Sequence, residues 1–184
     1  MRDFLYYSRL GNNSQFVESR LYAGLLGFRD DLSMINVEKT KESLLVINGF
    51  LKKVFEESFE SRILFVDLDC ETSVSSRHCA LTTLQPFLTE VEGWSSGKLT
   101  NSKIDNRIEA ICLLNVKSNN FIVQEANKLG IPIIGLLDND SSVDLIQFPV
   151  LINDDSSEIK SVVNSLICVS ILEGALLGYG LSCS

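Results

Sequence analysis

Short apolar runs of strand length alternate along the chain with longer segments whose apolar residues recur at helical spacing. The runs Ile63–Val66, Ala110–Leu114 and Ile131–Leu137 contain no charged side chain. The segments Glu38–Phe59 and Asn119–Leu129 place apolar residues three and four positions apart. Strands without a polar side must be covered on both faces, which is typical of a parallel sheet flanked by helices.

This alternation predicts a three-layer α/β/α domain of the doubly wound type, with a mainly parallel, five-stranded sheet. Gly130 follows the helical segment 119–129 and is the expected C-terminal stop. Further strands are expected at residues 32–36 and 148–152, which brings the number to five, and residues 87–91 are one more candidate strand. Further helices are expected at residues 73–84 and 156–177.

A length of 184 residues accommodates one sizeable core rather than two full domains. We expect an N-terminal extension at residues 1–27, a single domain at residues 28–177 and a C-terminal tail at residues 178–184. Residues 1–10 lack the apolar centre of a signal peptide. The most apolar stretch, residues 162–181, is interrupted by Asn164 and Glu173, so we expect a buried helix there and no membrane partner.

The net charge of −8 is unevenly distributed along the chain. Basic side chains exceed acidic ones in residues 1–53, whereas residues 129–184 carry Lys160 as their one cation against seven acidic side chains. Contacts with a polyanion must therefore use the first two thirds of the chain.

Acidic side chains follow several expected strands, where ligands of doubly wound domains bind. An apolar strand followed by Asp67-Leu-Asp69 resembles the first motif of haloacid-dehalogenase-like phosphatases, with Asp67 as nucleophile and Asp69 as general acid of a magnesium site. Glu71 stands where that motif has Thr or Val. The alternative interpretation is that these residues, like Asp138-Asn-Asp140 and Asn153-Asp-Asp155, are solvated carboxylates at strand ends.

Other signals of catalysis or cofactor binding are weak. His78 is the single histidine and is interpreted as a surface residue, and Cys112 and Cys168 lie in apolar runs typical of the core. The five cysteines show no paired spacing, and no glycine-rich phosphate-binding motif follows a strand. The sequence therefore predicts no metal, cofactor or small-molecule substrate.

The segment Trp94–Arg107 is locally basic within an acidic third of the chain. Short polar and basic side chains on a loop can contact phosphates and 2′-hydroxyls, although an ordinary surface loop has the same composition. Trp94 is interpreted as a packing anchor, with RNA contact as the alternative. The candidate RNA-binding residues are Lys98, Thr100, Asn101, Lys103 and Arg107, followed by Arg29, Lys39 and Lys41 near the strand at 32–36.

At this loop the sequence resembles the small-subunit ribosomal protein S2 family in its bacterial and organellar form. Trp94-Ser-Ser-Gly-Lys-Leu-Thr-Asn101 is similar to the family's Trp-Leu-Gly-Gly-x-Leu-Thr-Asn. Further similar segments follow in the family's order over about residues 28–175. They are Ile35-Asn-Val-Glu-Lys-Thr40, Ile63-Leu-Phe-Val66, Glu125-Ala-Asn-Lys-Leu-Gly130, Ile131-Pro-Ile-Ile-Gly-Leu-Leu-Asp-Asn-Asp140, Phe148-Pro-Val-Leu-Ile-Asn-Asp-Asp155 and Ile171-Leu-Glu-Gly174.

The resemblance implies a non-catalytic structural protein that binds small-subunit ribosomal RNA and neighbouring ribosomal proteins, and it makes the acidic clusters structural. The family's long basic helical hairpin after the Leu-Thr-Asn loop has no counterpart, because Asn101 is followed within nine residues by Ala110. Loss of this hairpin and the acidic charge suit a mitochondrial ribosome better than a plastid or bacterial one. The alternatives are the magnesium-dependent phosphatase and a free adaptor protein that derives from the same family.

Overall fold

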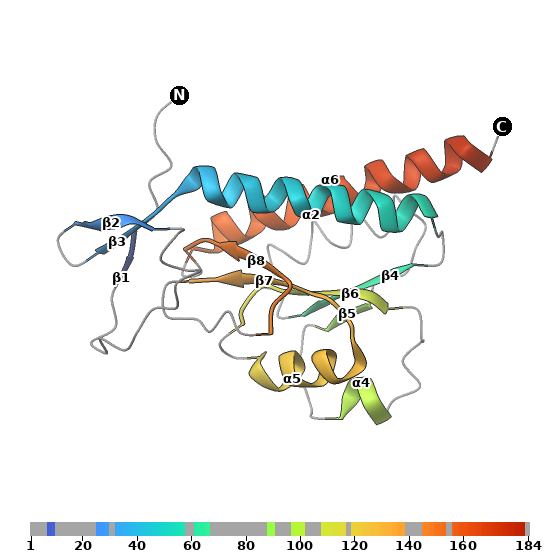
Figure 1. The fold of residues 1–184 in the computed structure, drawn as a ribbon, viewed down its shortest axis with the longest axis horizontal. Helices are drawn as coiled ribbons and strands as arrows, with labels where there is room; N and C mark the ends of the chain where they lie inside the picture. Colours follow the sequence, from blue (N-terminus) through green and yellow to red (C-terminus); the bar gives the residue numbers. More distant parts are fainter. Residues whose placement is uncertain are drawn as a thin grey trace.

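The computed structural model describes residues 7–9, 25–29, 32–57, 61–66, 88–90, 97–101, 108–116, 119–138, 145–153 and 156–182 (Figure 1). Two sheets and two long helices dominate this part of the chain. The larger sheet lies at the centre, and the smaller one lies at the end where the helix α2 (Val37–Glu57) begins.

The central sheet is parallel throughout and has the strand order β5-β4-β6-β7-β8. The chain order therefore reverses beside β4, as in doubly wound domains. The strands are β4 (Arg62–Val66), β5 (Leu88–Glu90), β6 (Ile108–Leu113), β7 (Ile133–Leu137) and β8 (Phe148–Leu151).

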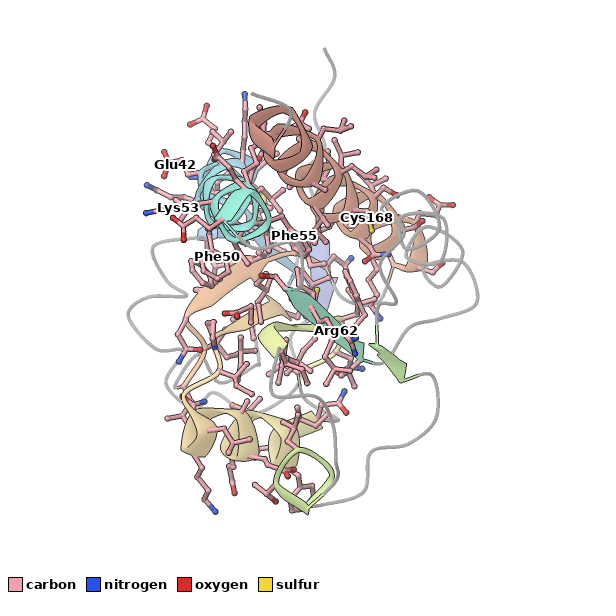
Figure 2. All side chains as sticks on the ribbon, turned by 90° about the vertical axis from the view of Figure 1, so that its right-hand side faces the viewer. Glu42, Phe50, Lys53, Phe55, Arg62 and Cys168 are labelled. Atoms are coloured by element: carbon pink, nitrogen blue, oxygen red, sulfur yellow. The ribbon has the colours of Figure 1, made fainter. Side chains whose placement is uncertain are left out.

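Helices cover both faces of this sheet, which confirms the predicted α/β architecture. The long helices α2 (Val37–Glu57) and α6 (Ser157–Ser182) pack side by side on one face. The helix α5 (Asn120–Leu129) and the short helix α4 (Lys98–Asn101) lie on the other. Figure 2 shows Phe50 and Phe55 of α2 directed towards the sheet.

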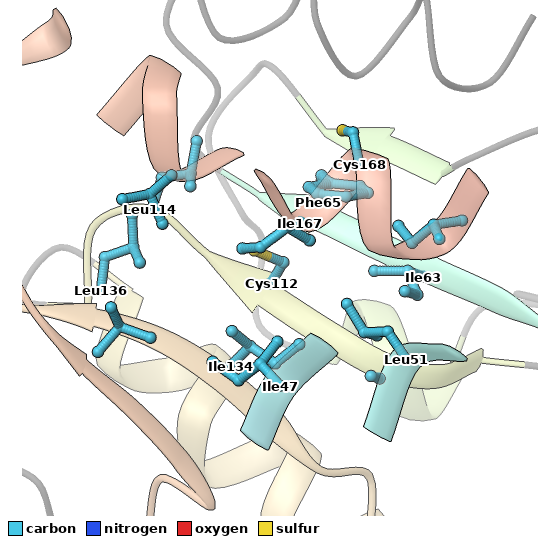
Figure 3. Packing of buried hydrophobic residues seen from close by; sticks show 14 of the residues in the cluster. Ile47, Leu51, Ile63, Phe65, Cys112, Leu114, Ile134, Leu136, Ile167 and Cys168 are labelled. Carbon is cyan, nitrogen blue, oxygen red and sulfur yellow. The ribbon is translucent and has the colours of Figure 1, made fainter. Parts of the chain in front are cut away.

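Alternate residues of each central strand enter two separate hydrophobic cores. In β4, Ile63 and Phe65 pack in the core beneath α2 and α6, whereas Leu64 and Val66 pack in the core on the α5 side. The first core also contains Cys112 and Cys168, as expected for small apolar residues (Figure 3). Burial raises the pKa of the Cys112 thiol, so the thiol stays protonated. Two-sided burial explains why these strands are uninterrupted apolar runs.

The strand expected at residues 32–36 does not join the parallel sheet, and that part of the sequence interpretation is wrong. It forms β3 (Leu32–Ile35), the middle strand of an antiparallel sheet with β1 (Tyr7–Arg9) and β2 (Leu25–Arg29). Met34 of β3 is only half-buried, unlike the wholly apolar strands of the central sheet. An antiparallel sheet can leave one face towards water, and its strands need not be apolar on both sides.

Most other predicted elements agree with the structure within a few residues. The strand expected at residues 87–91 is β5, and Gly130 ends α5 in the left-handed conformation with φ +73°. The helix expected at residues 73–84 lies outside the described residues. Helix α6 continues to Ser182, beyond the expected end at residue 177.

Among the described residues, α6 is the one helix long and apolar enough to cross a membrane by length and composition. Half of that stretch, Ser157–Gly178, is buried within the protein. The predicted buried helix is therefore confirmed for one side of α6 only, because aliphatic side chains including Val162 and Leu166 are exposed on its other side.

Helices α2 and α6 approach closely at Gly174. A Cβ atom at this position would lie 2.8 Å from the Lys52 carbonyl oxygen and 2.9 Å from the Lys52 Cα atom. Both are backbone atoms, so a side chain at residue 174 would force the helices apart. The Lys52 amine also pairs with the Glu173 carboxylate at 2.5 Å beside this contact.

Replacement of Gly174 should therefore destabilise the domain. We expect Gly174→Ala to lower the free energy of unfolding by about 1–3 kcal/mol, because overpacking separates α2 from α6. Urea unfolding followed by circular dichroism measures the change.

Gly49→Ala is the matched control, because Gly49 lies in the interior of α2 and a Cβ there would meet nothing within 4 Å. Alanine at an open helix position should raise stability by about 0.5–1 kcal/mol. Equal effects of the two substitutions would contradict the close contact.

Candidate nucleic-acid interface

A buried glutamate of α5 fixes the polar loop that the sequence singled out. The Glu125 carboxylate, whose residue is 8% exposed, accepts hydrogen bonds from the Thr100 amide at 2.8 Å and the Thr100 hydroxyl at 3.0 Å. The Gly97 amide donates to its other oxygen at 3.3 Å. Leu99 inserts into the core on the α5 side. The start of α4 is thereby attached to α5.

This arrangement has a simple electrostatic reason. The first amides of a helix lack partners within the helix and attract negative charge. Glu125 supplies that charge from a neighbouring element, and hydrogen bonds to a carboxylate are stronger than those between neutral groups. Gly97 begins this turn with φ +87°, a conformation that favours glycine.

The structure gives Thr100 an internal role. Both its amide and its hydroxyl donate to Glu125, although the residue itself is exposed. Lys98 and Asn101 lie in α4, and only their backbone is described. Lys103 and Arg107 lie outside the described residues, as does Trp94. RNA contact by this set stays a prediction.

The second predicted set lies elsewhere in the molecule. Lys39 and Lys41 are exposed on the first turns of α2, on the opposite face of the sheet from α4. The Lys39 amine pairs with Glu42 at 2.8 Å, and this hydrogen bond raises the pKa of Lys39. Arg29 lies in β2, where only its backbone is described. The α2 lysines and the α4 loop, which comprises residues 97–101, therefore do not form one continuous surface.

Sequence reasoning missed two groups on the exposed side of α5, next to α4. Phe121 is 69% exposed, and Lys128 is exposed in the last turn of the same helix. Aromatic rings stack on unpaired bases, and lysine amines bind phosphate. Positions 124, 125 and 128, which share the side of the helix with residue 121, are polar, so the helical spacing was an available signal that Phe121 faces outwards.

The segment Ile35-Asn-Val-Glu-Lys-Thr40 stabilises the fold. The Asn36 side-chain oxygen accepts the Glu38 amide at 3.0 Å and caps the start of α2. The Thr40 hydroxyl donates to the Leu151 carbonyl at 2.7 Å, which joins α2 to the end of β8. An asparagine directly before a helical pattern is a sequence signal for such a cap. No sequence pattern predicts the hydrogen bond between residues 40 and 151.

The acidic clusters are described only in part. Asp138 follows β7 directly and is buried, and Asn153 follows β8. Asp67, Asp69 and His78 lie outside the described residues. Within the described part of the chain, no group of three or more His, Cys, Asp or Glu side chains could hold a metal ion.

Loss of the Glu125 charge should loosen α4. We expect Glu125→Gln to lower the free energy of unfolding by about 1–3 kcal/mol, because an amide nitrogen would face backbone donors. Faster hydrogen exchange at the Thr100 amide provides the local readout. Gln124→Ala, on the exposed side of the same helix, is the control and should change neither quantity. An unchanged exchange rate at Thr100 in Glu125→Gln would contradict the assignment.

Comparison with known proteins finds similarity to one family. The model of the family "Ribosomal protein S2" matches residues 103–174. A protein named small ribosomal subunit protein uS2 from Bacteroides fragilis is 35% identical over 65 residues, which are 35% of this chain and 23% of that protein. The protein of the same name from Dictyoglomus thermophilum is 37% identical over 71 residues, covering 39% of this chain and 29% of that protein.

A longer alignment covers almost the whole chain. The protein of the same name from Psychrobacter sp. is 23% identical over 227 residues, which include 95% of this chain and 84% of that protein. The more similar regions thus span less than a third of the curated relatives' length, whereas the weaker similarity extends through most of both chains.

Proposed function

Because the chain is related to the ribosomal protein S2 family, we propose that it is a structural constituent of a small ribosomal subunit and supports translation. The observation that carries this proposal is the similarity of 95% of the chain to proteins named small ribosomal subunit protein uS2. The α/β fold with both sheet faces covered is consistent with it. Such a role requires binding surfaces and no catalytic centre.

The surface of α4 and α5 is the proposed contact with small-subunit ribosomal RNA. Glu125 accepts hydrogen bonds from Gly97 and Thr100, which restricts the motion of α4 and lowers the entropic cost of binding. The proposed RNA-facing residues are Lys98, Thr100, Asn101, Lys103 and Arg107, with Phe121 and Lys128 of α5 added.

Neighbouring ribosomal proteins are the second class of proposed partner. Phosphate contacts release counterions and need cations, and the chain has a net charge of −8. The family's basic hairpin is the element that would otherwise supply cations. Asn101 ends α4 and Ile108 already begins β6, and the 227-residue alignment exceeds the chain's 184 residues, so the relative has residues without a counterpart here.

We propose that this ribosome is mitochondrial. The support is the acidic charge and the missing basic hairpin, which together favour protein contacts over RNA contacts. The chain should be recovered with small subunits from purified mitochondria treated with protease. Recovery with cytosolic or plastid ribosomes alone would contradict this location and leave the ribosomal role intact.

Sucrose-gradient sedimentation tests the ribosomal role. A lysate of the native source is sedimented with and without EDTA, and fractions are blotted for the chain. Because a structural constituent remains bound when the subunits separate, the chain should move with the small subunit in both gradients. A large-subunit protein and a soluble enzyme serve as markers. Sedimentation only at the top of the gradient, as a protein of about 20.5 kDa, would contradict the proposal.

Charge reversal tests the RNA surface. Lys98→Glu, Lys103→Glu and Arg107→Glu introduced together should reduce incorporation into the small subunit by about ten-fold or more, because attraction to phosphate becomes repulsion. Lys98→Arg, Lys103→Arg and Arg107→Lys together keep the charge and should incorporate normally. Equal incorporation of the two triple variants would show that this loop does not bind RNA.

A further inference from the structure

The outer side of the α2–α6 pair carries an apolar groove of about 270 Å³. Its walls include Lys41, Leu45 and Asn48 of α2 and Leu166, Val169 and Ser170 of α6. All of these residues precede the point where Gly174 brings α6 against Lys52. The close contact and the Lys52–Glu173 ion pair thus close one end of the groove. Lys41 lies near the other end of the groove.

Two polar groups that line the groove have no interaction partner among the described residues. Among the described residues, Lys41 makes no ion pair, and the buried Asn48 side-chain oxygen has no hydrogen-bond partner. A buried oxygen without a donor is unfavourable, and an exposed amine beside aliphatic side chains attracts a carboxylate. The groove therefore suits an apolar ligand that brings an acidic group to Lys41.

The surroundings of the groove extend the apolar surface along α6. Val162, Leu166, Val169 and Leu176 are about half exposed or more, and they recur at helical spacing on the outside of the helix. Lys160 is the one cation of α6. A surface of this kind cannot neutralise phosphates, so RNA is a poor occupant. An amphipathic helix lays its own apolar side chains into such a groove.

We propose that the groove between α2 and α6 binds an amphipathic helix of a neighbouring small-subunit protein, whose apolar side fills the groove and whose carboxylate pairs with Lys41. This inference rests on the proposed ribosomal function and names the partner on one surface. It places protein on the α2–α6 face and RNA on the α4–α5 face, with the sheet between them.

Site-specific photo-crosslinking in the native subunit identifies the occupant. A benzophenone amino acid replaces Leu45 in the full chain, and small subunits are isolated from a gradient before irradiation. Mass spectrometry should locate the adduct on an apolar position of a helix in an identified small-subunit protein, with an acidic residue within two helical turns. The same probe at Lys53, an exposed residue of α2 outside the groove, should not give this adduct.

The crosslinking result separates failure of this inference from failure of the ribosomal role. Absence of the probe-bearing chain from small subunits, with the unmodified chain also absent, would refute the ribosomal role and this inference with it. Presence in the subunit with an adduct to RNA, to a second copy or to the chain itself, or with no adduct, would overturn the inference alone.

Adjacent substitutions provide a test that does not depend on the probe. Leu45 and Val46 are 60% and 61% exposed in the middle of α2, but only Leu45 lines the groove. Leu45→Asp should reduce incorporation into the subunit by about ten-fold or more, and Val46→Asp should reduce it less than two-fold. Thermal unfolding of the isolated variants controls for folding. Equal incorporation of the two would overturn the proposal.

Discussion

The fold depends on parallel strands whose central residues are buried on both faces of the sheet. Every residue from Ile63 to Val66 is buried, and so is every residue from Ile133 to Leu137. Such strands are stable only with helices above and below, and their parallel direction requires long connections that bring those helices into place. The close approach at Gly174 is a consequence, because α2 and α6 must share one face.

The residues that carry the family resemblance hold elements together. Asn36 caps α2, Thr40 joins α2 to β8, and Glu125 joins α5 to the loop that contains Thr100. The resemblance is thus explained by the fold as much as by any contact with RNA. A rigid scaffold still matters to binding, since loops fixed before association lose less entropy on contact.

The sequence predicted the central sheet well because apolar runs and helical spacing report burial directly. It placed residues 32–36 in the wrong sheet, because a short apolar run does not reveal which strands pair with it. For the candidate site, the polar loop was found, but the internal role of Thr100 was not. That role depends on a hydrogen bond to Glu125, which lies twenty-five positions further along the chain. Sequence periodicity and residue propensity do not predict such a long-range contact. The groove beside Leu45 likewise arises only from packing.

The central claim is that the chain lies in a small ribosomal subunit and contacts a different neighbour on each of its two faces. These two faces differ in chemistry. One presents an α4 loop beside Phe121 and Lys128, and the other presents the aliphatic side of α6. A cryo-electron microscopy map of the small subunit from the native source tests it most directly. The account predicts one copy of this domain, with ribosomal RNA against α4 and α5 and a protein helix along α2 and α6. A map of the complete subunit without this domain would contradict it.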